Sequence, residues 1–231
     1  MMDFSILIAT MYSRKALFDK LLIEVNRQIC EIDEIRLRVV NTNKGRFMKS
    51  RRIPTFEVLY EVDGGEMTLG AKRNLLVSRA NGKYCCFIDD DDIISPTFLQ
   101  TFIPMIYGDY DCASFLGMYY YRGTSNLPFE KPFYHSLDVK DWAEVDGKYL
   151  RSVSPMNMIK TDIVRNIQYA DIRNTEDHEF SIRLMKSGLL RKEFKIPNVP
   201  IYHYIDGVKG TRELWNYRWI ENFTKIELFI S

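Results

Sequence analysis

The chain has 231 residues, of which 46% are hydrophobic and 27% charged, and its net charge is +1. This length suits one large domain with a real core, and the composition is that of an ordinary globular protein. No apolar run approaches the roughly 20 residues of a membrane span. Neither a basic leader nor a cleavage site precedes Phe4. We therefore expect a cytoplasmic protein without a transmembrane segment.

The cysteines are few and have no metal-binding spacing. They are Cys30, Cys85, Cys86 and Cys112, with no C-x-x-C pair. Cys85 and Cys86 are adjacent in an apolar segment, where strand side chains point to opposite faces. We expect reduced, buried thiols, with neither a disulfide nor a zinc site.

The first half of the chain alternates between strand and helix patterns. An apolar run over 4–9 predicts a buried strand, and Ser13 can cap a helix with apolar residues at spacings of three and four. Period-two alternation over 35–39 predicts a second strand. The following elements are a strand over 56–62, a helix over 70–80 and a strand over 84–88. This order implies a parallel, Rossmann-like sheet.

The second half is less regular. Pro96 begins a predicted helix that reaches about residue 107, and 111–122 has strand character. The segment 127–146, rich in proline and aromatic residues, is predicted to be a loop with one short helix. The last predicted elements are helices capped by Thr161 and Thr175, a strand over 201–204 and a helix over 213–230. No linker separates the halves, so we expect a single domain.

Four adjacent carboxylates follow the predicted strand over 84–88: Asp89, Asp90, Asp91 and Asp92. They repel one another, whereas Mg²⁺ or Mn²⁺ would gather such hard oxygen ligands. The carboxyl end of a strand is also where open α/β sheets bind ligands. The block therefore predicts a metal-assisted binding site. The alternative is a solvated acidic turn before the next helix.

The neighbourhood of the acidic block carries a family resemblance. Gly70 to Asn74 is followed by Ala80-Asn81-Gly82-Lys83-Tyr84, the apolar strand, the four aspartates, two isoleucines and Pro96. This succession resembles the signature of family 2 glycosyltransferases. The resemblance implies a GT-A (Rossmann-like) single domain over 1–231, α/β, with a mixed, mostly parallel sheet flanked by helices. Residues 1–95 would form the nucleotide-sugar half, and 96–231 the acceptor half with a C-terminal helix.

The same resemblance implies roles for individual residues. Asp89 would contact the nucleoside side of the donor and Asp91 would ligate the metal on the diphosphate, which stabilises charge on the leaving group. Asp92 would contact the sugar or support the site from behind, and Asp90 would be the variable position. Arg73 is a further candidate donor contact.

A second motif is Asn174-Thr175-Glu176-Asp177-His178. It resembles the family's E-D motif, which opens a helix near the acceptor, and Asp177 aligns with the catalytic base. A base is needed to take the proton of the attacking hydroxyl. Glu176 and His178 are candidate acceptor contacts. The alternative is that acids in a first helical turn only complement the helix dipole.

His203 follows in the order in which many GT-A enzymes carry a late metal-binding histidine. Neutral imidazole can bind Mn²⁺ beside carboxylates. The alternative is a packed histidine with hydrogen bonds of its own.

The end of the first strand, with Thr10, Tyr12 and Arg14, is similar to the family loop that cups the nucleotide base. Asn41 ends the predicted second strand, where the family usually has an aspartate. These four residues are our remaining candidate donor contacts.

From Arg36 to Arg52 the chain has seven cations and no acid. Arg46, Lys49, Arg51 and Arg52 are the candidate contacts to an anionic acceptor such as DNA with hydroxylated bases. The alternative is a solvated loop.

Taken together, the motifs and the family resemblance predict a metal-dependent glycosyltransferase, and the resemblance implies that it is inverting. We expect it to use Mn²⁺ or Mg²⁺ and a nucleotide-sugar donor, with a UDP-sugar favoured, and a glycan or DNA acceptor. One alternative is a noncatalytic nucleotide-sugar- or glycan-binding module. An aspartate-based phosphohydrolase fits poorly. That class has a D-x-D-x-[TV] motif with a later Ser or Thr and a Lys, whereas here Ile93 and Ile94 follow the aspartates.

Overall fold

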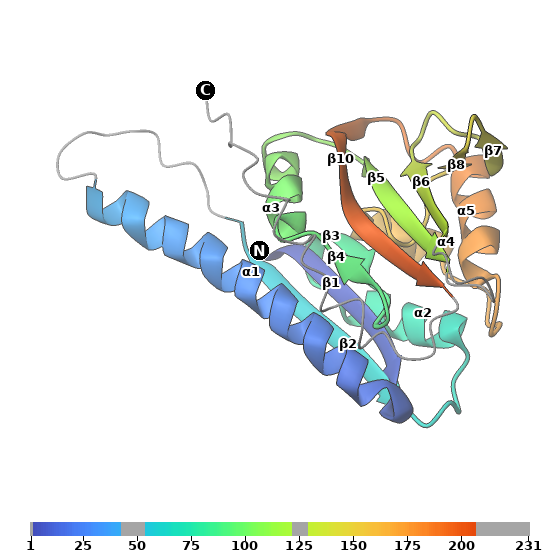
Figure 1. The fold of residues 1–231 in the computed structure, drawn as a ribbon, viewed down its shortest axis with the longest axis horizontal. Helices are drawn as coiled ribbons and strands as arrows, with labels where there is room; N and C mark the ends of the chain where they lie inside the picture. Colours follow the sequence, from blue (N-terminus) through green and yellow to red (C-terminus); the bar gives the residue numbers. More distant parts are fainter. Residues whose placement is uncertain (1, 43–53, 122–128, 207–231) are drawn as a thin grey trace.

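The structure, a computed structural model, describes residues 2–42, 54–121 and 129–206 (Figure 1). Its centre is a ten-stranded mixed sheet in the order β2-β1-β3-β9-β5-β6-β8-β7, with β10 paired to β5 and β4. The strands are β1 Met2–Met11, β2 Phe56–Asp63, β3 Gly82–Phe87, β4 Ile93–Ile94, β5 Cys112–Tyr121, β6 Phe129–His135, β7 Ala143–Val145, β8 Lys148–Arg151, β9 Ile159–Lys160 and β10 Glu193–Asp206. The α-helices are α1 Lys15–Thr42, α2 Leu69–Arg79, α3 Phe98–Phe102, α4 Thr161–Ile167 and α5 Glu176–Lys186. None of the described helices is both long and apolar enough to cross a membrane.

The first half of the sheet is parallel, as the strand–helix–strand order predicted. β1 lies between β2 and β3 and runs parallel to both. Parallel strands end at one edge of a sheet, so Thr10, Asp63 and the segment after Phe87 come together there. The short β9 joins β3 to β5 by antiparallel pairing, which continues the sheet into the second half of the chain.

Helices cover both faces of this sheet. On one face, α1 and α3 pack on Phe4, Ile6 and Ile8, the alternate residues of β1. On the other face, α2, α4 and α5 cover Leu7 and its neighbours on β3. Strand alternation also divides the adjacent cysteines, with Cys86 in the first core and Cys85 in the second. Two buried cores therefore hold the sheet edge in place.

The strand predicted over 35–39 is wrong. α1 continues without a break from Lys15 to Thr42, so Asn41 lies in its last turn and does not end a strand (Figure 1). The period-two pattern gave the wrong prediction because residues 35–39 are also compatible with a continuing helix. They contain no glycine or proline that would end one. The strand beside β1 is β2, and the residue at its end is Asp63.

The loop predicted over 127–146 is wrong as well. β6 pairs antiparallel with β5, and β7 and β8 form a hairpin with β8 parallel to β6. Pro132 obscured β6 in the sequence because proline is rare inside sheets. All four cysteines are free, as expected, but Cys30 is exposed and not buried. The helix predicted over 213–230 lies outside the described residues.

Two buried histidines make the sheet sensitive to acid. His135 on β6 stacks on Phe115, and His203 on β10 stacks on Tyr120. Burial lowers the pKa of His203 to about 4 and that of His135 to about 3. An unfolded histidine has a pKa of about 6.5, so below that pH the unfolded chain binds protons that the folded chain does not.

We therefore expect stability to fall as the pH drops from about 6.5 to about 4, by up to about 1.4 kcal/mol per pH unit for each histidine. Thermal melting across this range would measure the fall. His203→Gln should give a shallower fall than the unaltered chain. Equal slopes for the two proteins would contradict the assignment of a neutral, buried His203.

Candidate active site

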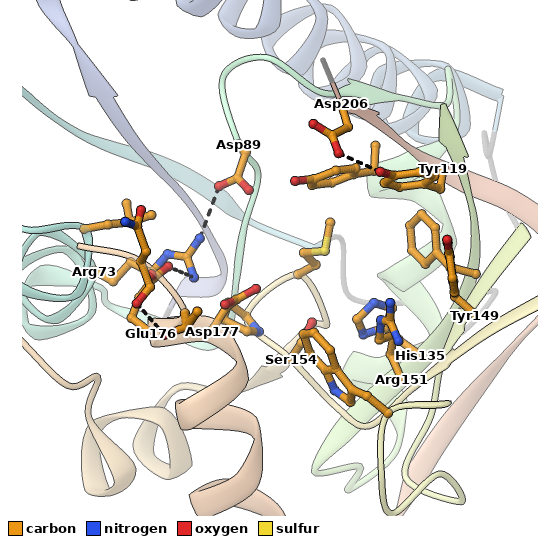
Figure 2. Close-up of a pocket in the computed structure, with 18 of the residues that line it drawn as sticks. Arg73, Asp89, Tyr119, His135, Tyr149, Arg151, Ser154, Glu176, Asp177 and Asp206 are labelled. Atoms are coloured by element: carbon orange, nitrogen blue, oxygen red, sulfur yellow. Dashed lines mark hydrogen bonds and ion pairs between the residues drawn. The ribbon is translucent and has the colours of Figure 1, made fainter. Parts of the chain in front are cut away.

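A cavity of about 370 Å³ opens at the sheet edge, between the end of β3, the start of α5 and the sheet formed by β5, β6, β8 and β10 (Figure 2). Its walls differ in character. Acidic groups and Arg73 lie on one side: Asp89, Glu176 and Asp177. Aromatic rings and Arg151 lie on the other: Tyr119, Phe133, His135, Trp142, Tyr149 and Tyr204. The remaining lining residues include Asp206, Arg173, Ser154 and Met156.

The aspartates of the acidic block have separate roles in the structure. Asp90 is buried and is held to β1, where it accepts hydrogen bonds from the Thr10 hydroxyl and, at 2.6 Å, from Arg14 Nη1. Burial raises the pKa of Asp90, and these two donors oppose that rise. Asp90, which was expected to be the variable position, thus binds the acidic block to the end of β1.

Asp92 is held to β10, whereas Asp90 is held to β1. Its carboxylate accepts hydrogen bonds from the Tyr202 hydroxyl at 2.7 Å and from the Ile205 N–H at 2.9 Å, both on β10. Tyr202 in turn accepts a hydrogen bond from the Asp89 N–H at 3.2 Å. Asp92 therefore fits the supporting role better than direct contact with a sugar, and its role remains a prediction.

Asp89 and Asp91 are the two accessible members, with side chains 32% and 30% exposed. Asp91 lies 2.7 Å from Arg14 Nη2. Burial raises the pKa of Asp91, and the nearby Asp89 charge raises it further while Arg14 lowers it. A divalent cation would offset this repulsion.

The residues present fit a metal that arrives with its ligand. Among the described residues, no group of three or more His, Cys, Asp or Glu side chains could hold a metal ion alone. Mg²⁺ commonly uses one or two carboxylates plus substrate phosphates and water. Asp89 and Asp91 can supply those carboxylates. His203 packs on Tyr120, whose hydroxyl lies 3.2 Å from its Nδ1, so its predicted metal role gains no support from this placement.

Arg73 joins the two sequence motifs. Its side chain is 4% exposed and lies between the Phe87 and Tyr169 rings. Nη2 is 3.3 Å from Asp89, and Nη1 is 3.1 Å from Glu176. Burial opposes its charge, but the carboxylates prevail, Asp89 first, and the pKa of Arg73 lies above its ordinary value. Nε and Nη1 are buried and make no hydrogen bond within the described chain.

The rest of the Gly70–Asn74 motif positions the same site. Lys72 donates to the Thr10 carbonyl at 2.7 Å and forms an ion pair with Asp63. Asn74 holds the Tyr169 backbone through two hydrogen bonds, of 2.8 and 2.7 Å. Asp63, missed because the second strand was misplaced, also accepts the N–H groups of Gly65 and Met67. This motif therefore ties β1, β2 and the segment before α5 together.

The E-D motif lies where it was predicted, at the start of α5. Glu176 is buried against Arg73, and burial raises its pKa while Arg73 opposes the rise. Asp177 is half-buried, lines the cavity and accepts the His178 N–H at 2.8 Å. His178 lies outside the lining and packs on Trp142, with ring centroids 4.5 Å apart. Of the two acids, Asp177 is the one that is free to act on a bound molecule.

Other predicted site residues lie apart from this cavity. Tyr12 is largely exposed, and Thr10 and Arg14 act here through Asp90 and Asp91. The side chain of Asn41 is not described, and its place in α1 removes the strand-end argument for it. Arg46, Lys49, Arg51 and Arg52 lie outside the described residues, so the DNA-binding hypothesis stays a prediction.

Comparison with known proteins finds a matching family and related proteins. A model of the family "Glycosyl transferase family 2" matches residues 57–168, which include the Gly70–Asn74 motif and the acidic block. This matched stretch, just under half of the chain, is similar to glycosyltransferase family 2. An uncharacterized glycosyltransferase, MJ1057 of Methanocaldococcus jannaschii, is 25% identical over 167 residues, which cover 68% of this chain and 56% of that protein.

Solved structures match the fold of this chain. Residues 1–349 of S. aureus TarS in complex with UDP-GlcNAc superimpose with a TM-score of 0.57 at 18% identity, covering 90% of this chain and 60% of that one. The TarS complex with UDP gives 0.55 at 18% identity, covering 88% and 60%. The chain has the GT-A fold and spans less than two thirds of the length of these relatives.

The family motif implies a test of packing at Gly70. A Cβ there would lie 1.8 Å from the Ala170 carbonyl oxygen, which belongs to the backbone before α5. Helix propensity alone would make Gly70→Ala stabilising by up to about 1 kcal/mol. We expect the clash to prevail and to cost about 1–3 kcal/mol.

Denaturant unfolding would measure this loss. Ala71→Gly, one position along α2, should cost only about 1 kcal/mol through its propensity. A higher unfolding midpoint for Gly70→Ala than for the unaltered chain would contradict close docking of α2 on the 170–172 segment.

Proposed function

We propose that this chain is a metal-dependent, inverting glycosyltransferase that moves a sugar from a UDP-sugar to a hydroxyl acceptor. The observation that carries the proposal is that Asp89 and Asp177 line one cavity, although they belong to motifs far apart in the sequence. The complexes of TarS with UDP-GlcNAc and UDP favour a uridine nucleotide as donor.

The donor would bind along the edge formed by Asp89, Asp91 and Arg73. Asp91 would hold Mn²⁺ or Mg²⁺, which stabilises negative charge on a diphosphate leaving group. Asp89, predicted to contact the nucleoside side of the donor, offers a second accessible carboxylate to the same metal. The guanidinium of Arg73, which lines the cavity from a buried and preorganised position, would offset negative charge on the donor. Thr10 and Arg14 hold the acidic block in place, so its geometry does not depend on the ligand.

Asp177 would act as the base. Its carboxylate takes the proton of the acceptor hydroxyl, whose oxygen forms a bond to the anomeric carbon. The bond from that carbon to the diphosphate oxygen breaks, and its electron pair leaves with the nucleoside diphosphate. A single displacement of this kind inverts the anomeric carbon. Glu176 is a weaker candidate because its carboxylate is buried against Arg73.

A panel of UDP-, GDP- and TDP-sugars with Mn²⁺ tests the proposal. Release of the nucleoside diphosphate from a UDP-sugar, slowly with water and faster with acceptor, is the expected result. Tight donor binding without any turnover would instead indicate the noncatalytic nucleotide-sugar-binding module.

For the base, we expect Asp177→Asn to cut turnover by about 10²–10⁴-fold. The amide cannot take a proton, but it keeps the size of the side chain, so calorimetric donor affinity should change little. Glu179→Gln is the control, because Glu179 lies on the same helix, does not line the cavity and pairs with Arg183. Unaltered turnover in Asp177→Asn would reject Asp177 as the base.

For the metal, we expect Asp91→Asn to abolish transfer and the Mn²⁺-dependent part of UDP binding, since a carboxylate ligand becomes a neutral amide. Calorimetry of UDP with and without Mn²⁺ measures that part. Asp19→Asn, an exposed aspartate of α1, is the control. If Mn²⁺ strengthens UDP binding equally in Asp91→Asn and the unaltered chain, then Asp91 is not a ligand.

A further inference from the structure

The aromatic side of the cavity contains a cation, Arg151, that has no polar partner among the residues that the structure describes. Arg151 ends β8 and lines the cavity, and its guanidinium stacks over Trp142 at 4.5 Å and over Tyr149 at 4.8 Å from the ring centroids. Within the described chain its side chain makes no hydrogen bond, and no carboxylate lies within 4.0 Å of it. Burial lowers the pKa of Arg151 below its ordinary value.

The other two arginines of the cavity have polar partners within the described chain. Arg73 has Asp89 and Glu176, and Arg173 donates to the Gly65 carbonyl at 3.0 Å. A half-buried guanidinium that gives up water and gains only ring contacts loses solvation free energy. An anionic ligand would restore that loss, because a planar guanidinium can pair with a carboxylate or phosphate through two hydrogen bonds.

The guanidinium is also held rigidly. The Trp142 Nε1–H donates to the Ser152 hydroxyl at 3.1 Å, which fixes the indole beneath Arg151. His178 packs on the same indole, with ring centroids 4.5 Å apart, and links it to α5. Arg151 therefore keeps a fixed position relative to the helix that carries Asp177, and little rotamer entropy is lost when it binds a ligand.

The walls around Arg151 suit a ring-shaped molecule. Tyr119, Tyr149 and Tyr204 line the cavity beside it, and Tyr119 stacks on Tyr204 with centroids 5.4 Å apart. The opposite wall carries Asp89, Glu176 and Asp177 (Figure 2). Asp206 also lies on the aromatic side, where it accepts a hydrogen bond from the Tyr119 hydroxyl at 2.6 Å, so the attraction for an anion on that side comes from Arg151. A molecule with a hydroxyl at one end and an anionic group at the other would thus be oriented by charge.

We infer that Arg151 is a specificity-determining residue of the acceptor subsite, and that the acceptor is a sugar or polyol carrying a carboxylate or phosphate ester near its reactive hydroxyl. This inference rests on the proposed function, because it assigns the acceptor side of the same cavity. The anion lies against Arg151, the ring lies on the tyrosines, and the hydroxyl faces Asp177.

Direct binding tests the inference without needing transfer. Calorimetry or saturation-transfer NMR would use methyl glycosides of glucose, galactose and N-acetylglucosamine, their 6-phosphates, and the uronic acids of the first two. For at least one sugar we expect an anionic form to bind about tenfold more tightly than the neutral form, in the presence of UDP and Mn²⁺. Preference for the uronic acid or for the phosphate would identify which anion the acceptor carries.

Arg151→Gln should reduce the anionic-to-neutral ratio of affinities to near one, and Arg151→Lys should keep part of it, because charge remains but the stacked fork is lost. Lys148→Gln is the matched control, since Lys148 is an exposed cation on the same strand and outside the cavity. It should leave the ratio unaltered. Melting temperatures would establish that each variant folds.

With the donor identified by UDP release, the same ratios would be measured as kcat/KM for transfer. The inference is overturned if no anionic form binds more tightly than its neutral counterpart, or if Arg151→Gln keeps the preference. Lack of donor turnover together with an Arg151-dependent preference would reject the proposed function and leave the anion subsite in place.

Discussion

The buried charge of Arg73 is the constraint on which the arrangement of this site depends. A guanidinium that is 4% exposed needs carboxylates close by, and it obtains them from two motifs separated by more than 80 residues in the sequence, through Asp89 and Glu176. Moving α5 away from β3 would leave that cation without one of its partners. The acidic end of β3 and the first turn of α5 are therefore held at a fixed separation before any ligand arrives.

The aspartate block shows how one run of identical residues divides into different tasks. Asp90 and Asp92 are buried and bind the ends of β1 and β10, whereas Asp89 and Asp91 keep exposed oxygens between them. The buried pair fixes the backbone, and the exposed pair is left crowded and negative. Burial raises the pKa of Asp90, Asp91 and Asp92 alike, so the block resists ionisation unless positive charge comes near. Arg14 supplies part of that charge.

Sequence reasoning predicted the strand and helices around this half of the site because their patterns are local. The strand before Asp89, the helix after Thr68 and the helix after Thr175 all have short, legible patterns. It failed at 35–39, where period two and a continuing helix fit the same five residues, and no glycine or proline decided between them. That error displaced the strand end from Asp63 to Asn41, and with it one predicted donor contact. It failed again at β6, where Pro132 looked like a loop residue.

The aromatic wall was beyond the reach of sequence patterns for a different reason. Arg151 has no motif, and its character comes from Trp142 and Tyr149, which reach it only because β7 and β8 form a hairpin against β6. In the sequence, Arg151 is one cation among 32 lysines and arginines. What distinguishes it is that Arg73 in the same cavity has two carboxylates while Arg151 has two aromatic rings. Arg73, whose charge is balanced by carboxylates, can hold two parts of the protein together. Arg151, which contacts only aromatic rings, can still form an ion pair with a bound anion.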